Sequence, residues 1–312
     1  MVTQSGGERD NVGSSTDLRQ EGVQVYALLY LVIAGSLLGL STTLAKVASD
    51  WALAPFPFLT WSLLGATCIL IAAGAVRGRL PRITGRAIEY YGIAALVTVA
   101  GSNLIFYSAV PIVGAGFVAL AITLPPLLTY GGALMFRLEG FSLIRFLGVL
   151  SALLGAGLLA VNKIEEDYAS VSWIALTLAG PVLLAIGNIY RTLRWPPGAS
   201  AEELAPGMLV AATLMLFAVS FLPHFSLWPS EFTAAHAMLI ALQAIIFASY
   251  FLVTFLLQKT GGPVFLSLLG SVGAIVAVPV AILLLGENVP GGLAYATALI
   301  GLGIVLLNQR RA

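Results

Sequence analysis

Amide, hydroxyl and tyrosine side chains stand inside several long apolar stretches of this sequence. Asn103 and Tyr107 are four residues apart in GSNLIFYSAV, a spacing that places both on one face of a helix. Gln243 and Tyr250 are seven residues apart in another stretch and also share a face. Such groups exchange hydrogen bonds, and a tyrosine ring also packs against apolar groups. Together they predict a lining for a small molecule with a polar and an apolar part.

Helix-interrupting residues extend this candidate lining. Pro125 and Pro126 in ITLPPLLTY lack a backbone N–H and should kink a helix near its middle. Small residues around Ser271 interrupt a second apolar stretch, SLLGSVGAIVAVP. The alternative is structural, since prolines also bend helices, small residues allow close packing and polar side chains link helices. The predicted substrate-binding residues are Asn103, Tyr107, Thr123, Pro125, Asn188, Tyr190, Gln243, Tyr250 and Ser271.

The composition places these residues in a membrane protein. Of the 312 residues, 59% are hydrophobic and only 9% are charged, and the mean hydropathy is +0.98. Soluble domains carry about 25% charged residues. A net charge of +1 without a basic, aromatic face argues against a nucleic-acid partner. The single cysteine, Cys68, excludes an intrachain disulfide, and we expect neither a metal nor a cofactor.

Ten apolar runs reach the length of about 20 residues that a helix needs to cross a bilayer. Short connectors make neighbouring helices antiparallel, so we predict an all-α integral membrane fold with ten transmembrane helices. Residues 1–22 are polar, mixed in charge and rich in Gly and Ser, which predicts a disordered cytoplasmic tail. The predicted spans are about 23–46, 54–76, 87–108, 111–135, 142–161, 171–191, 204–223, 235–258, 262–285 and 289–308.

The basic residues orient these spans. With the amino terminus in the cytoplasm, thirteen of the fifteen Lys and Arg residues fall in cytoplasmic segments, as the positive-inside rule expects. The basic stretch RGRLPRITGR, residues 77–86, then connects the second and third spans on the cytoplasmic side. Recognition of acidic lipids or nucleic acid is the alternative interpretation of this arginine cluster. Both termini are predicted to be cytoplasmic.

A weak internal repeat divides the chain into two halves, residues 23–162 and 163–312. AGSLLGLSTTLAK in the first span resembles AGPVLLAIGNIYR in the sixth at an offset of 145 residues. MFRLEG resembles LLLGEN at an offset of 148, which aligns Glu139 with Glu287. Because five spans is an odd number, the second half enters the membrane from the opposite side. Inverted repeats of this kind are typical of secondary transporters that work by alternating access.

Ten spans, two five-span repeats and the hairpin LLLGENVPGGLAYATALIGLGIVLLN resemble the EamA-type branch of the drug/metabolite transporter superfamily, over about residues 23–308. Within it the chain is similar to bacterial inner-membrane exporters of aromatic and other amino acids. The resemblance implies a basket-like ten-helix transporter with a central cavity, and export of amino acids or related metabolites. The first half departs from the family pattern, with MFRLEG where a Gly-Glu pair is usual.

The positions of the charges narrow the cargo. The middles of the fourth and ninth spans hold no Lys or Arg, which disfavours a phosphate. Lys46 and Arg191 close the first span of each half, and we interpret both as interfacial cations. Glu89 is expected at the cytoplasmic boundary. A neutral, zwitterionic or amphipathic solute remains, and a monomer is compatible with these features.

Two alternatives to a transporter stay open at this point. A non-transporting membrane scaffold or sensor would have a packed, dry centre in place of a cavity. A lipid-active membrane enzyme would need clustered titratable groups, whereas the spans hold almost none and carry no P-loop, HExxH or GxSxG motif. We therefore do not expect an enzyme.

Overall fold

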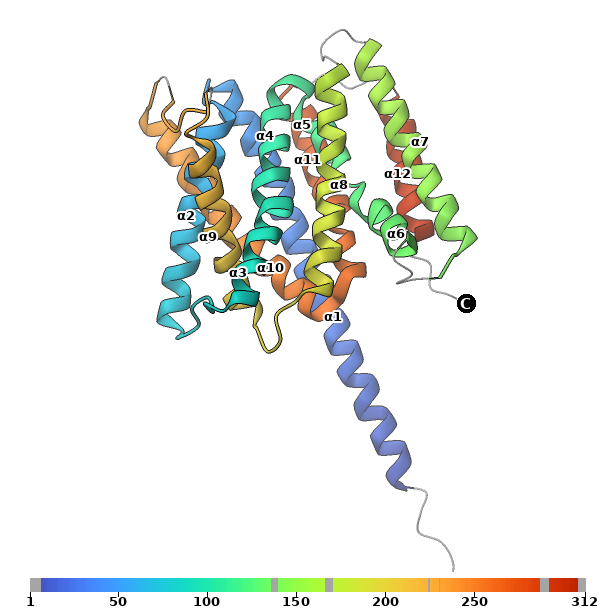
Figure 1. Cartoon of the computed structure of the whole chain (residues 1–312). Coiled ribbons are helices and arrows are strands. Elements are labelled where there is room, and N and C mark those ends of the chain that lie inside the picture. The colour runs from blue at the N-terminus through green and yellow to red at the C-terminus, as the bar shows by residue number, and fades with distance from the viewer. Residues whose placement is uncertain are drawn as a thin grey trace, which may run out of the picture.

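Helices make up all the regular structure in the part of the chain that the computed structural model describes, residues 7–135, 140–165, 171–223, 225–229, 231–286 and 292–307 (Figure 1). Within these residues, seven helices are long and apolar enough to cross a membrane. Three further apolar helices are shorter. The predicted all-α membrane class is therefore confirmed.

The first half of the chain follows the predicted spans closely, with two differences inside them. The third span is continuous but contains a π-helical turn, η1, and the fourth is divided by a short turn. Its elements are α1 (Gly7–Asp50), α2 (Pro55–Val76), α3 (Gly85–Ala95), η1 (Leu96–Ala100), α4 (Gly101–Val113), α5 (Ala115–Ala121), α6 (Pro125–Met135) and α7 (Leu143–Glu165).

Helix α1 is longer than its apolar run. It begins at Gly7, so most of the segment predicted as a disordered tail is helical. The early part of α1 extends away from the bundle in Figure 1. A helix that is already formed adds residues at little cost, because only nucleation is strongly unfavourable. The helical bundle provides such a nucleus.

The second half has a helix in place of each of the five predicted spans, although two of these helices, α11 and α12, are shorter than a span requires, and one boundary moves. Its elements are α8 (Val171–Leu193), α9 (Ala201–Val219), α10 (Ala234–Ser267), α11 (Leu269–Leu283) and α12 (Leu293–Leu307). The polar run at 258–260 predicted the end of a span, yet α10 continues to Ser267 and the chain breaks at Leu268. A helix can hold polar residues near an interface. Glu139 and Glu287 lie outside the described residues.

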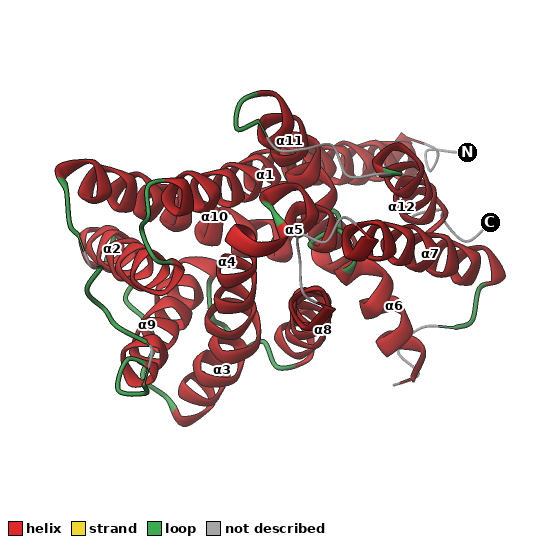
Figure 2. Cartoon of the chain, turned by 90° about the horizontal axis from the view of Figure 1, so that it is seen from above, coloured by secondary structure: helices red, strands yellow, loops and turns green. Residues whose placement is uncertain are grey.

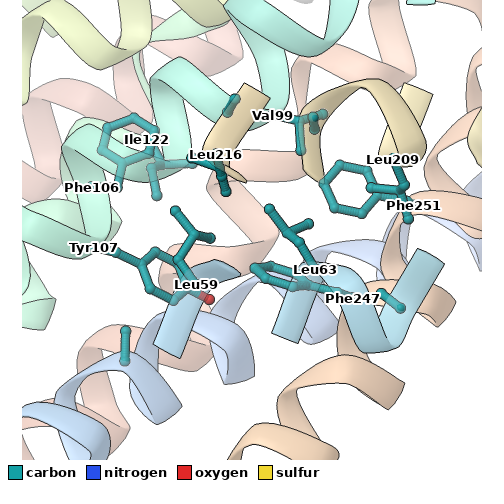
Figure 3. Close-up of a cluster of buried hydrophobic side chains, with 14 of the residues drawn as sticks. Leu59, Leu63, Val99, Phe106, Tyr107, Ile122, Leu209, Leu216, Phe247 and Phe251 are labelled. Carbon is teal, nitrogen blue, oxygen red and sulfur yellow. The ribbon is translucent and has the colours of Figure 1, made fainter. Parts of the chain in front are cut away.

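Helices of the two halves pack against each other throughout the bundle. Helix α1 packs against α10 and α11, α8 packs against α4 and α6, and α2 packs against α9 and α10. Helices α7 and α12 pair at one end of the bundle, and α2 and α9 lie at the other (Figure 2). Side chains of α2, α4, α9 and α10 meet in the main apolar core (Figure 3).

Two interrupted helices meet near the middle of the bundle. The turn between α5 and α6 covers Ile122 to Leu124, and it packs against the start of α11. A β-carbon on Gly270 would overlap the Ile122 carbonyl group, so only glycine permits this approach. The two breaks therefore lie against one another.

The arginine-rich connector between α2 and α3 is tied to the start of α9. Arg79 pairs with Glu202, and Arg82 Nε lies 3.0 Å from the Glu203 carboxylate. Both acids stand in the first turn of α9, where negative charge complements the helix dipole. The arginine side chains are about half exposed, so each pair contributes about 0–1 kcal/mol. The connector thus has structural partners within the fold.

We predict that Gly270→Ala destabilises the protein, because the added methyl group meets backbone atoms that cannot move away. Overpacking of this kind costs about 1–3 kcal/mol. Gly301→Ala in α12 is the matched control, since no atom lies within 4 Å of its added β-carbon. Thermal unfolding in detergent should show a lower midpoint for Gly270→Ala alone. Equal midpoints for the two variants would contradict the close packing of the two breaks.

Candidate functional site: a cavity between the two halves

A cavity lies inside the bundle, bounded by α1, α4, α5, α6, α8, α10, and α11. It offers about 70 Å³ to the centres of water molecules. One water needs only about 10–15 Å³ by that measure, so the cavity holds several. Apolar side chains such as Phe106, Ile122 and Phe251 share the lining with hydroxyl and amide groups. A site of this kind suits a small molecule with polar and apolar parts.

The break between α5 and α6 forms part of the cavity wall. Pro125 and Pro126 have no N–H to donate, so the helix ends before them and begins again at Pro125. The Thr123 hydroxyl donates to the Leu120 carbonyl at 2.7 Å. Pro125 and Ile122 line the cavity, whereas Thr123 acts as a partner for the freed backbone.

The π-helical turn η1 lies just before the polar residues that α4 contributes. The Gly101 N–H donates to the Leu96 carbonyl, five residues back. The Asn103 side-chain N–H donates to the Val99 carbonyl at 2.8 Å. Asn103 lines the cavity with its neighbour Ser102, whose buried hydroxyl has no hydrogen-bond partner. π-Helical turns frequently occur at functional sites, but no sequence pattern predicted this one.

A buried ring of three polar side chains joins α1, α4 and α10. The Gln243 side-chain N–H group donates to Ser41 Oγ at 2.7 Å and to the Tyr107 hydroxyl at 2.5 Å. The two hydroxyl oxygens lie 2.8 Å apart. Ser41 and Tyr107 line the cavity, and the fully buried Gln243 lies behind them. Gln243 therefore positions the lining, whereas Tyr250, seven residues further along the helix, lies in the cavity wall itself.

Arg191 is the functional candidate that the sequence interpretation missed. Its side chain lines the cavity and is only 4% exposed, so it is not an interfacial cation. The Arg191 Nη2 group donates to Gln258 Oε1 at 2.5 Å, and the guanidinium carbon lies 4.4 Å from the centre of the Phe255 ring. Lys46, which the sequence comparison aligned with Arg191, instead pairs with Asp50 on the surface at 2.6 Å.

The polar face of α10 was the signal that could have found Arg191. Tyr250, Thr254 and Gln258 recur every four residues, so they form one polar stripe on an otherwise apolar helix. A stripe of this kind inside a membrane needs a polar partner on the facing helix. Arg191 of α8 is that partner.

The structure brings five of the nine predicted residues to the cavity wall. Tyr190 is elsewhere: its ring stacks on Tyr90 at 6.1 Å, and it lines a groove with Glu89 and Arg194 near the end of α8. Glu89 pairs with Arg194 at 3.7 Å. Ser271 and Thr123 lie beside lining residues but not in the wall. The five lining residues are Asn103, Tyr107, Pro125, Asn188 and Tyr250.

The electrostatics of the cavity are simple. Arg191 is the one charged side chain among the described residues of the lining, and no described Asp or Glu faces it. No cluster of three or more His, Cys, Asp and Glu residues that could hold a metal ion occurs among the described residues. Hydrogen bonding, aromatic packing and one positive charge are the means of recognition that the lining offers.

Comparison with known proteins agrees with this architecture. Residues 25–161 match the model of the EamA-like transporter family. A solved crystal structure with 18% sequence identity matches 93% of this chain and 98% of its own, with a TM-score of 0.59, which shows a shared fold. No curated protein matches the chain. Residues 25–161 of this helical membrane protein are therefore similar to the EamA-like transporter family, a branch of the drug/metabolite transporter superfamily.

Proposed function

We propose that the protein is a secondary transporter that moves amino acids or similar small amphipathic metabolites across the membrane by alternating access. The cavity between the two halves of the chain is the observation that carries this proposal. A scaffold or sensor of the same fold would need no solvated chamber at its centre. The family assignment of residues 25–161 also supports a transporter role.

The packing of the helices supports two inverted halves of five spans each, residues 23–162 and 163–312. If α8 is the counterpart of α1, the contact of α1 with α10 corresponds to that of α8 with α4. Likewise the contact of α1 with α11 corresponds to that of α8 with α6. In the pairs α7–α12 and α5–α11, each helix packs against its own counterpart, so exchanging the halves leaves both pairs unchanged. A pattern of contacts that survives this exchange is what an inverted repeat produces.

Alternating access follows from such an exchange. When two similar halves swap their conformations, a state open on one side becomes a state of similar energy open on the other. A ligand at their shared seam is then reached from either side in turn. The seam here contains the two interrupted helices, α5–α6 and α10–α11, which is where broken helices place transporter binding sites.

The lining and the charge distribution support the rest of the proposal. Phe106 and Phe251 offer apolar surface for a side chain, and Asn103, Asn188 and Tyr250 offer hydrogen bonds. The basic connector between α2 and α3 favours cytoplasmic termini. We place the protein in a bacterial inner membrane, acting as an exporter, as its resemblance to amino acid exporters implies.

Efflux from proteoliposomes tests the transport proposal. Vesicles loaded with labelled phenylalanine or leucine should lose the label faster when they contain the protein than when they are protein-free. A panel of unlabelled amino acids placed outside the vesicles, with and without a proton gradient, identifies exchange and coupling. No gain over protein-free vesicles for any amino acid or amphipathic metabolite in the panel would contradict the proposal.

We predict that filling the cavity stops transport. Ser102→Phe places a large ring where a small buried hydroxyl now lines the wall. Efflux should fall by about tenfold or more, because a cost of about 1.4 kcal/mol in binding already gives that factor. Ala298→Phe, at an exposed position of α12, is the control and should keep the wild-type rate. Similar rates for both variants would show that solute does not pass through this cavity.

We predict opposite membrane sides for the two connectors at the ends of α2 and α10. In a Cys68→Ser background, Phe232→Cys and Leu80→Cys each provide one exposed thiol, since both side chains are more than half exposed. A membrane-impermeant maleimide added to right-side-out cells should label Phe232→Cys, and should label Leu80→Cys only after permeabilisation. Labelling of both variants in intact cells would contradict the orientation.

A further inference from the structure

The charged end of the cavity has more hydrogen-bond donors than its described acceptors receive. We propose that Arg191, Thr254 and Gln258 form a subsite for the carboxylate of an amphipathic monocarboxylate, and that the cavity has no matching site for an ammonium group. The inference deepens the proposed function, and it rests on that function to the extent that the bound solute is also the transported one.

The charge of Arg191 lacks a counterion within the described residues. The guanidinium group donates to the neutral Gln258 amide, packs on the Phe255 ring and lies near two tyrosine hydroxyl groups, and no described carboxylate lies within ion-pair distance. Glu89, at the same end of the bundle, pairs with Arg194 instead. An arginine side chain stays charged at any physiological pH. A charge buried without a counterion is unfavourable, so an anionic ligand would relieve it.

Three buried donors at this end of the cavity have no partner. They are the Arg191 Nε–H, the side-chain NH2 group of Gln258, which lies behind the cavity wall, and the Thr254 hydroxyl, which lies beside that of Tyr250. The residues are 4%, 8% and 3% exposed, so water does not cover them as it would at a surface. Buried polar groups in native proteins nearly always have a partner, which makes three neighbouring exceptions informative.

Thr254 differs from most threonines of the bundle. Thr43, Thr60, Thr67 and Thr98 each donate a side-chain hydrogen bond to the carbonyl four residues back. Helical threonines commonly satisfy their hydroxyl in this way. Thr254 makes no such bond and lines the cavity. Its hydroxyl is therefore available to a ligand.

The position of the donors on their helices brings them together. Tyr250, Thr254 and Gln258 follow one another at intervals of four residues, on the face of α10 that Arg191 of α8 contacts through Gln258. The Tyr250 and Tyr90 hydroxyl groups also lie near the guanidinium group. A carboxylate accepts several hydrogen bonds on two oxygens, and the arginine fork matches that geometry.

The charge count favours a monocarboxylate over other anions. Arg191 is the one cation among the described lining residues, so a phosphate dianion would leave a negative charge without a partner. The remaining wall offers apolar side chains, including Phe106, Leu184 and Phe251. Because no described acidic side chain lines the cavity, an ammonium group would find no counterion. The carboxylate and an apolar body are therefore the recognised parts.

This subsite is separate from the Ser41–Tyr107–Gln243 ring. Gln243 and Gln258 lie fifteen residues apart on α10, which corresponds to about 22 Å along a helix. A molecule of amino acid size does not reach both groups. The ring and the Arg191 subsite therefore belong to different parts of the solute path.

Binding of matched probes to the purified protein in detergent tests this proposal. The probes are 3-phenylpropionate, its neutral amide 3-phenylpropionamide, and phenylalanine, measured by isothermal titration calorimetry. Wild-type protein should bind 3-phenylpropionate about tenfold to a hundredfold more tightly than the amide, the range for hydrogen bonds to a charged group. Phenylalanine should bind no more tightly than 3-phenylpropionate.

Three variants assign that preference to the subsite. Arg191→Gln should abolish it while leaving binding of the amide unchanged. Thr254→Val removes one donor and keeps the charge, so it should reduce the preference in part and serves as the test if Arg191→Gln does not fold. Arg194→Gln, three residues further along the chain, just after the end of α8, and largely exposed, is the matched control and should behave as wild type.

Several outcomes would overturn the subsite. They are equal binding of the carboxylate and the amide by wild-type protein, no binding of either, or a preference that neither Arg191→Gln nor Thr254→Val reduces. Efflux assays separate this failure from that of the proposed function. Carboxylate binding that depends on Arg191 without any flux would contradict transport alone, whereas flux that is indifferent to the carboxylate and to Arg191 would contradict the subsite alone.

Discussion

Inside a bilayer, every backbone group released from a helix needs another partner, and this requirement shapes the centre of the protein. Helices α5–α6 and α10–α11 are both interrupted, and the interruptions lie against each other where Gly270 meets the Ile122 backbone. The Thr123 hydroxyl donates a hydrogen bond to the Leu120 carbonyl at this turn. Such irregular backbone is tolerated where protein or a cavity surrounds it. The crossing of the two breaks and the cavity beside it are therefore parts of one arrangement.

The same requirement separates structural polar groups from candidate functional ones. The hydroxyls of Thr60 and Thr67 donate hydrogen bonds to carbonyl groups of their own helices. The Asn103 side chain likewise donates to the Val99 carbonyl beside the π-helical turn. These side chains maintain backbone hydrogen bonding and need no ligand. Thr254 and Arg191 keep buried donors without partners and line the cavity. The fold alone accounts for the side chains that bond to backbone carbonyls, whereas the proposed ligand accounts for Thr254 and Arg191.

Length and apolar character were sufficient to locate the helices, because the bilayer imposes both on any crossing helix. The π-helical turn and the extension of α10 to Ser267 depend on local hydrogen bonding, which apolar runs do not record. Arg191 was misinterpreted for a different reason. A cation near the end of a span usually reaches the interface, and its burial here depends on Phe255 and Gln258 of another helix. Contacts between helices far apart in sequence decided which polar residues line the cavity.

Under the proposed alternating access, the buried and uncompensated charge of Arg191 would link ligand binding to a change of conformation. In the conformation described here Arg191 lies between α8 and α10, and this state is costly while the site is empty. A bound carboxylate neutralises the guanidinium group, so it stabilises this arrangement relative to one in which Arg191 reaches water. A ligand shifts a conformational equilibrium by the difference between its affinities for the two states. The proposed ion pair would supply such a difference at the seam between the two halves, which is where the proposed alternation would occur.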